Sequence, residues 1–324
     1  MLRRRHLLAA GLAAPALARA QAAAWAPSRP LRFVVPFPAG GATDVAARIL
    51  AERLTESLGQ PAVVENRTGS SGNIGTENVV RSAPDGHTLL MGTSGALTVN
   101  PLLFPNLGFE PARDLQPVSL AFTTDNALIV NPNMPARTVA EFLALARSRP
   151  GAFSYGSAGS GSSTHMAAEL FRLAAGIEVL HVPYRGSAPA LNDTVAGNVQ
   201  FMVDQLASCI GQVQAGRVRA LAVTGPRRSP LLPDVPTMAE AGLPGAENTS
   251  WGAVLVPAGT PEAAVGRLGA AVREAVGVPA VRERMAQAGA DAAASSPAEL
   301  AALMRREAER WGKVVKEAGV SPAG

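Results

Sequence analysis

The sequence predicts an α/β protein built around parallel β-strands. From residue 31 onward, short runs rich in β-branched residues alternate with longer amphipathic stretches, a pattern typical of βαβ units with right-handed crossovers. The length of 324 residues favours about two domains. The hydrophobic fraction of 47% is too high for a disordered chain.

The first third of the chain contains the clearest of these alternations. A strand is expected at 31–37, followed by a loop at 38–44 and by a helix at 45–58 whose apolar residues recur on one face. The next strand, loop, helix and strand are expected at 62–65, 68–72, 73–82 and 87–91.

The alternation continues from residue 127 to the end of the chain. Thr138 and Glu141 form a capping box, in which two side chains satisfy free amides at a helix start. Residues 226–245 are rich in proline and glycine and are expected to be irregular. Further strands, with helices between them, are expected at 127–130, 153–155, 179–184, 199–203, 220–224 and 251–256. Helices that begin with proline, which a first turn tolerates, are expected at 261–276, 279–288 and 297–318.

The formal charge of +4 is concentrated at the N-terminus. Arginines at 3–5 precede an apolar run at 7–17, and a small-x-small sequence ends at Ala20, which is the pattern of a secretory signal peptide over residues 1–20. The adjacent arginines 4 and 5 also fit a twin-arginine signal, so the export route stays open. The apolar run is shorter than the roughly 20 residues of a membrane-spanning helix. Without residues 1–20 the chain has 25 basic and 25 acidic side chains, so we expect no nucleic-acid partner.

Side chains suited to catalysis or metal binding are sparse. His87, His165 and His181 are far apart in the sequence and form no helical metal-binding pair, and no Gly-x-Ser-x-Gly motif occurs. Cys209 has no partner for a disulfide and is expected in the core. The glycine-rich stretch 156–163 lacks the lysine of a phosphate-binding loop and the spacing of a dinucleotide site. We therefore expect no metal, no cofactor and no enzymatic activity, with an exported enzyme acting on an organic acid as the alternative.

Two glycine-rich loops, one in each half of the chain, have the character of anion sites. Residues 38–44 and 155–165 each lie between an expected strand and an expected helix, where glycines and helix N-terminal amides can approach an anion. Ligands of open parallel sheets bind beyond the carboxyl ends of the strands, where these loops lie. Each loop also has a structural interpretation, since Asp44 can cap a helix and His165 can be a buried side chain.

Five motifs resemble those of one known family, the Bug receptors. They are VPFPAGGATD at 35–44, VENRTGSSGNIG at 64–75, PDGHTLL at 84–90, YGSAGSGSSTH at 155–165 and HVPYRGS at 181–187. Bug receptors are the extracytoplasmic solute-binding components of tripartite tricarboxylate transporters. The resemblance covers essentially the whole chain after the expected signal peptide.

The resemblance implies a type II periplasmic-binding-protein fold, with two α/β lobes and a ligand cleft between them. The chain would cross between the lobes near Asn126 and near Thr249. Residues 31–125 plus 250–324 would form lobe 1, and residues 126–249 would form lobe 2. The implied location is the periplasm.

The resemblance also implies a ligand class and a set of contacts. The ligand would be a small carboxylate (a di- or tricarboxylate, an acidic amino acid, nicotinate or an aromatic acid) held mainly by backbone amides and hydroxyls. Carried over residue by residue, the lobe 1 contacts would be Phe37, Ala39, Gly40, Gly41, Thr43 and Asp44. The lobe 2 contacts would be Ser157, Gly159, Ser160, Gly161, Ser162, Thr164 and His165. The family often has proline where this chain has Ala39.

Three further residues would edge the cleft. Tyr184 and Arg185 end one expected strand, and Asp204 ends another. Asp204 could accept a hydrogen bond from the ligand or brace the closed form. Arg185 could clamp a distal carboxylate or pair with Asp204 or another acid.

The predicted function is therefore that of a monomeric periplasmic receptor for a small carboxylate. It would close on its ligand by hinge motion and present the closed form to a membrane permease. A receptor that hands its ligand to a sensor protein, without transport, is the alternative. The sequence does not identify the carboxylate.

Overall fold

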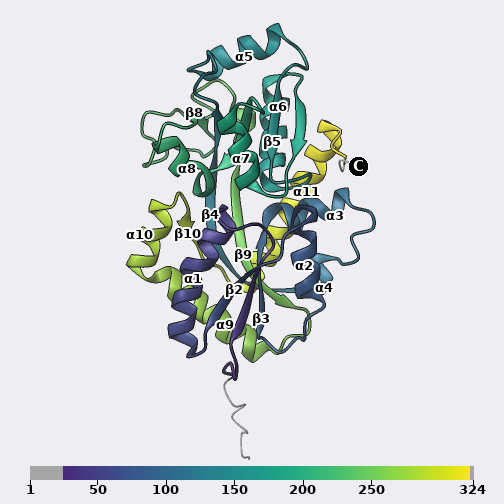
Figure 1. Cartoon of the computed structure of the whole chain (residues 1–324). Helices are drawn as coiled ribbons and strands as arrows, with labels where there is room; N and C mark the ends of the chain where they lie inside the picture. Colours follow the sequence, from purple (N-terminus) through teal and green to yellow (C-terminus); the bar gives the residue numbers. More distant parts are fainter. Residues whose placement is uncertain (1–24, 322–324) are drawn as a thin grey trace, which may run out of the picture.

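The computed structural model describes residues 25–321 of the chain. The predicted signal peptide lies outside these residues. Figure 1 shows an elongated molecule, in which α5 to α8 gather around short strands at one end and α1, α9 and α10 lie at the other. Two long strands, β4 and β9, run between these ends. Among the described residues, no helix combines the length and apolar character needed to span a membrane.

The first group of strands has the order β2-β1-β3-β9-β4. The first three are parallel, whereas β9 is antiparallel to both β3 and β4. The strands are β1 (Leu31–Val35), β2 (Ala62–Asn66), β3 (Thr88–Thr93), β4 (Leu115–Val130), β9 (Thr249–Pro257) and the short β10 (Asp291–Ala292), which pairs with β4.

Helices cover both faces of this first group. They are α1 (Ala42–Leu58), α2 (Asn73–Val80), α9 (Glu262–Gly277), α10 (Pro279–Gln287) and α11 (Pro297–Ala318). Alternate residues of β1 face opposite cores, as the pleat of a strand requires. Phe33 packs in the core that includes Leu50 and Leu268, whereas Val34 packs in the core that includes Leu300 and Met304.

The second group of strands begins where β4 continues beyond the first. Its residues 126–130 pair with β7 (Phe201–Gln205) and β8 (Arg219–Val223). β5 (Ser154–Ser157) is parallel to both β7 and β6 (Leu180–Pro183). The helices of this group are α5 (Val139–Ser148), α6 (Ser163–Ala175), α7 (Ser187–Ala196) and α8 (Leu206–Gln214). Cys209 is fully buried in the core that also contains Met202 and Leu191.

The passage of β4 between the two groups occurs within one step of the chain. Asp125 pairs with Thr249 of β9, and the next residue, Asn126, pairs with Gln205 of β7. The hydroxyl of Thr224 accepts a hydrogen bond from the amide of Asn126 (2.9 Å) and donates one to the carbonyl of Asn248 (2.5 Å). Three chain segments therefore meet at this point.

The α/β architecture with parallel strands is confirmed, and most elements lie within a few residues of their predicted bounds. The largest difference is β4, which was expected only at 127–130 but begins at Leu115. Polar residues and Pro117 interrupt its first part, and no hydrophobic alternation marks it as a strand. Short elements that were not expected are η1 (Ser70–Gly72), the π-helical η2 (Gly95–Val99), α3 (Asn100–Leu103), α4 (Pro111–Asp114), η3 (Pro244–Ala246) and β10.

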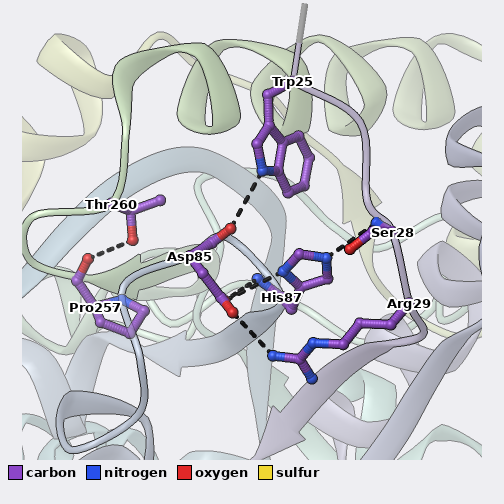
Figure 2. A network of polar contacts seen from close by, with 7 residues as sticks. All are labelled: Trp25, Ser28, Arg29, Asp85, His87, Pro257 and Thr260. Atoms are coloured by element: carbon purple, nitrogen blue, oxygen red, sulfur yellow. Dashed lines mark hydrogen bonds and ion pairs between the residues drawn. The ribbon is translucent and has the colours of Figure 1, made fainter.

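The segment before β1 is fastened by the 84–90 motif (Figure 2). The indole Nε1 of Trp25 donates to the carbonyl of Asp85 (3.2 Å), and Arg29 Nη2 pairs with the Asp85 carboxylate (2.9 Å). The amide of Ser28 donates to Nε2 of His87 (3.1 Å), so the imidazole proton belongs on Nδ1, which lies 3.2 Å from an Asp85 carboxylate oxygen. This motif therefore holds the N-terminal segment against the sheet.

Candidate functional site

A cavity lies between the loop that follows β1 and the loop that follows β5. It is narrow in this structure, since the space among its lining atoms is about 360 Å³ only when the adjoining open solvent is included. Its lining residues are Phe37, Pro38, Gly41, Ala42, Thr43, Thr93, Ala158, Ser162, Ser163, Thr164, Ser187 and Gln205. None of them is charged, so the polar groups that face the cavity are hydroxyls, one carboxamide and backbone atoms.

Four helices of at least nine residues begin at this cavity. The first residues of α1, α6 and α7 line it, as does Gln205, which precedes α8. Among these helices only α6 has a side-chain cap, from Ser162. The first amides of a helix have no partner within the helix, and each N-terminus has the effect of about half a positive charge. The cavity is therefore suited to an anion although no cationic side chain lines it.

Asp44 holds the first loop from within. Its carboxylate accepts hydrogen bonds from the amide of Gly40 (3.0 Å), Arg48 Nε (3.0 Å) and Asn66 Nδ2 (2.9 Å). Burial alone would raise the pKa of Asp44, but these three donors outweigh it, and the pKa lies below its ordinary value of 3.8. The Asp44 carboxylate is thus negatively charged and fixes the conformation of the loop, and it does not line the cavity.

His165 has the corresponding place in the second loop. Its Nδ1 accepts a hydrogen bond from the amide of Gly161 (2.9 Å), so its proton is on Nε2. The ring stacks on that of His181, with centroids 3.9 Å apart, and His181 Nε2 is 2.6 Å from the hydroxyl of Ser157. Burial lowers the pKa of His165 to about 4 and that of His181 to about 3, so both are neutral near pH 7.

A buried network continues behind these histidines. The hydroxyl of Tyr155, whose ring stacks on His181, donates to Glu169 (2.5 Å), and Glu169 pairs with Arg172 (2.8 Å). Arg172 in turn donates to the carbonyl of Ala318 at the end of α11 (2.8 Å). The second loop is therefore connected through α6 to the last helix of the chain.

The two sides of the cavity are in direct contact at one edge. The hydroxyls of Ser94, after β3, and Ser163, at the start of α6, are 2.9 Å apart. A Cβ atom at Gly161 would come within 2.4 Å of Asn100 Oδ1, and one at Gly95 would come within 2.6 Å of the Gly161 carbonyl. The structure therefore shows a closed arrangement, in which glycines permit the close approach.

The structure brings five of the predicted contacts to the cavity. They are Phe37, Gly41, Thr43, Ser162 and Thr164. Four others, together with Phe37, line a neighbouring hollow: Gly159, Ser160, Tyr184 and Arg185. The remaining predicted residues line neither space: Ala39, Gly40, Asp44, Ser157, Gly161, His165 and Asp204.

Asp204 illustrates how a residue near a strand end can be bonded within the protein and not exposed to the site. Its fully buried carboxylate accepts hydrogen bonds from the Gln205 amide (2.9 Å) and from Ser208. Burial raises its pKa to about 6, although hydrogen bonds from Ser208 and Ser187 oppose this shift. Within residues 25–321 Arg185 makes no ion pair, so its pairing with Asp204 or another acid does not occur in this structure.

Several lining residues were not among the predicted contacts. They are Pro38, Ala42, Thr93, Ala158, Ser163, Ser187 and Gln205. Thr93 and Gln205 are the last residues of β3 and β7, and Ser187 is the first of α7. The sequence already places residues 93–95 in a loop of the same character as 38–44 and 155–165, although Thr93 was not listed as a contact. Applying the rule that ligands bind at the carboxyl ends of parallel strands to every strand end would also have found Ser187 and Gln205. In the described part of the chain, no group of three or more histidine, cysteine or acidic side chains is placed to hold a metal ion.

Comparison with known proteins places this chain in a family. Residues 46–320 match the family model described as the tripartite tricarboxylate transporter family receptor. The structure is similar to that of Rpa4515 of R. palustris with adipate, with a TM-score of 0.89, 39% identity and coverage of 92% of this chain and 99% of that one. It is also similar to the periplasmic binding protein BugD, with a TM-score of 0.87, 36% identity and coverage of 92% and 100%.

A further solved structure is similar in the same way. MatC of Rhodopseudomonas palustris, with bound malate, has a TM-score of 0.85 and 35% identity, with coverage of 89% of this chain and 99% of that one. Two of these three similar structures thus contain a dicarboxylate.

Proposed function

This chain belongs to the tripartite tricarboxylate transporter receptor family, and on that premise we propose that it is a periplasmic receptor that captures a small carboxylate between two lobes. Similarity to BugD, a periplasmic binding protein, supports the location. The adipate-bound and malate-bound relatives support a carboxylate as ligand, and in particular a dicarboxylate.

The observation that carries the proposal is the uncharged cavity where four helices begin. A carboxylate that enters it exchanges water for hydroxyls and helix N-terminal amides, and charge-assisted bonds of this kind are the stronger ones. The lining residues include no histidine, cysteine or carboxylate that could act as a general acid or base. The hydroxyls of the lining thus have no lining histidine or carboxylate beside them to activate them, which supports a binding role for this site.

The contacts to the carboxylate would come from part of each predicted loop, including Ala42 and Ser163, which were not among the predicted contacts. The amides of Gly40 and Gly161 are already bonded to Asp44 and His165. The donors that face the cavity lie in residues 41–43 and 162–164. Gly40, Asp44, Gly161 and His165 then act by fixing the shape of the two loops.

We assign residues 31–125 plus 250–324 to lobe 1 and residues 126–249 to lobe 2. The hydrogen bonds of Asn126, Thr224 and Asn248 would then form the hinge. Opening about this point would separate Ser94 from Ser163 and admit the ligand, and closure would exclude water from it. The closed monomer would be presented to a membrane permease, with a sensor protein as the other candidate partner.

The proposal is tested by removing one amide on each side of the cavity. Gly41 has φ −81° and ψ 165°, a conformation open to both alanine and proline, so Gly41→Pro removes an N–H that Gly41→Ala retains. Ser163→Pro and Ser163→Ala form the same pair at the first residue of α6, where proline is tolerated.

Affinity would be measured by calorimetry against adipate, malate, benzoate, glucose and Mg²⁺. Each proline variant is expected to bind the preferred acid about tenfold or more weakly than its alanine control, since a hydrogen bond to a charged group contributes about 1.5–3 kcal/mol. Equal affinities within both pairs would overturn the assignment of the amides. Binding of glucose or Mg²⁺, with no acid bound, would overturn the ligand class.

A further inference from the structure

A second hollow adjoins the cavity and is open to one side of the site. With the adjoining open solvent included it measures about 710 Å³, against about 360 Å³ for the cavity on the same measure, and the two share Phe37 and Ala158. Its walls come from the turn 69–72, from Phe104, and from the segments that follow β5 and β6. A ligand held in the cavity could therefore extend into this hollow past Phe37.

Arg185 is the charged residue in the lining of this hollow. It is exposed, and no acid in the described chain pairs with it. Its neighbour Tyr184 is held separately, because the Tyr184 hydroxyl donates to Asp193 Oδ2 (2.6 Å). The guanidinium thus keeps all of its donors for a ligand.

The backbone beside Arg185 is fixed against the first loop. Gly186 has φ +134°, and a Cβ atom there would come within 2.5 Å of Pro38 Cδ. Pro38 itself lines the cavity. Arg185 therefore stands one residue from the contact between the two sides of the site.

The opposite wall provides hydroxyls on a constrained turn. Ser70 and Ser71 have φ values of +46° and +54°, a region that serine adopts at a cost. A Cβ atom at Gly72 would lie 3.2 Å from the ring of Phe37, so this turn packs on the aromatic ring between the two spaces. The hollow thus combines an apolar wall, hydroxyls and one cation.

We propose that this hollow is a distal subsite for a dicarboxylate, in which Arg185 pairs with the second carboxylate while the first occupies the cavity. The inference rests on the proposed function, and it adds that Arg185 selects dicarboxylates over monocarboxylates of equal length. The spacer between the two carboxylates lies along Phe37. A fork-shaped guanidinium matches a carboxylate better than an ammonium does, so lysine substitutes for Arg185 only in part.

The test compares acids that differ only in the second carboxylate. Adipate and hexanoate have the same number of carbons, and succinate, glutarate and pimelate vary the spacer. Affinity would be measured by calorimetry on the whole receptor and on the Arg185→Gln, Arg185→Lys and Arg217→Gln variants. Arg217 is an exposed arginine that follows the C-terminal end of α8, away from the cavity where that helix begins, so its variant removes the same charge elsewhere.

The unmodified receptor is expected to prefer a dicarboxylate over hexanoate. Arg185→Gln is expected to weaken dicarboxylate binding about tenfold and to leave hexanoate binding unchanged. The dicarboxylate affinity of Arg185→Lys should lie between those of Arg185→Gln and the unmodified receptor, and Arg217→Gln should have no effect. Equal losses for both acids, no loss for either, or a preference for hexanoate in the unmodified receptor would overturn the subsite. If the unmodified receptor binds no carboxylate, the proposed function fails instead.

Discussion

The two loops at the cavity share one backbone device and differ in the side chain that completes it. Gly40 and Gly161 both adopt a left-handed conformation, with φ +86° and +81°, and each donates its amide to the side chain four residues later. That acceptor is the carboxylate of Asp44 in the first loop and the imidazole of His165 in the second. The loop geometry therefore requires an acceptor at this position but not a particular charge.

The surroundings of each acceptor explain the choice. Asp44 contacts Arg48, whose side chain is 52% exposed, so the carboxylate has a cation beside it and remains charged. His165 is stacked on His181 in the interior, where an unpaired charge would be costly, and it is neutral. The comparison shows that burial and partners decide which chemistry can hold the same turn.

Replacing Gly40 and Gly161 by alanine is expected to give the largest difference in effect between the two loops. At Gly161 an added Cβ meets Asn100 and Leu103 across the closed site, whereas at Gly40 no atom lies within 4 Å. Gly40→Ala should cost only the left-handed strain of about 1–2 kcal/mol in thermal unfolding. Gly161→Ala should add to that strain a loss of ligand affinity of about tenfold or more, because closure is blocked. Equal ligand affinities in the two variants would contradict a closed state of this geometry.

The two acceptors should also respond to pH in different ranges. The pKa values of His165 and His181 are lowered by burial to about 4 and 3, so between pH 6.5 and 4 the unfolded chain binds protons that the folded chain excludes. The stability that these neutral histidines contribute is complete above pH 6.5. On acidification below that value, each histidine should lower the free energy of unfolding by about 1.4 kcal/mol per pH unit. The pKa of Asp44 is also lowered, so its contribution is lost only as the pH falls below 3.8.

Urea unfolding at pH 7.5, 6.0 and 4.5 would check this separation. His165→Asn keeps an acceptor for the Gly161 amide and should reduce the slope of unfolding free energy against pH by about half. Asp44→Asn should lower the free energy of unfolding at all three pH values and leave that slope unchanged. A steep slope that survives in His165→Asn would mean that this histidine is not the group that titrates.

The smallest effect is expected at the helix caps. The Ser162 hydroxyl accepts a hydrogen bond from the His165 amide (3.3 Å), whereas Gly41 offers no side chain to α1. Ser162→Ala should therefore destabilise the ligand-free protein by about 1 kcal/mol, and Gly41→Ser should stabilise it by a few tenths. Thermal unfolding without ligand would measure both, and a stabilising Ser162→Ala would show that its hydroxyl does not cap α6.

Local patterns were sufficient where a structure depends on residues close in the sequence. The helix expected at 297–318 is α11 with the same bounds, and the capping box of Thr138 and Glu141 opens α5. The positions of both loops followed from glycine and from the strands before them. The contacts of the loops could not be predicted in this way, because Ser94 and Ser163 meet only when distant segments pack together.

Asp44 and Asp204 show the same limit for individual residues. Each ends or follows a strand near the cavity, and sequence position alone allowed each a ligand contact or an internal role. Three donors surround Asp44, and Asp204 is turned toward Ser208, so both carboxylates are occupied within the protein. The decision depends on neighbours that the chain brings together only on folding.

The burial of Cys209 beside Met202 and Leu191 has a practical use. Cys209 is the single cysteine of the chain, and burial raises the pKa of its thiol well above the ordinary value. A thiol without solvent access and without thiolate character does not react with maleimides. A cysteine introduced at the exposed position 39, in place of Ala39, would then be the thiol that a maleimide dye labels. The fluorescence of that dye would change when the site closes. The natural chain is already suited to becoming an optical sensor for its own ligand.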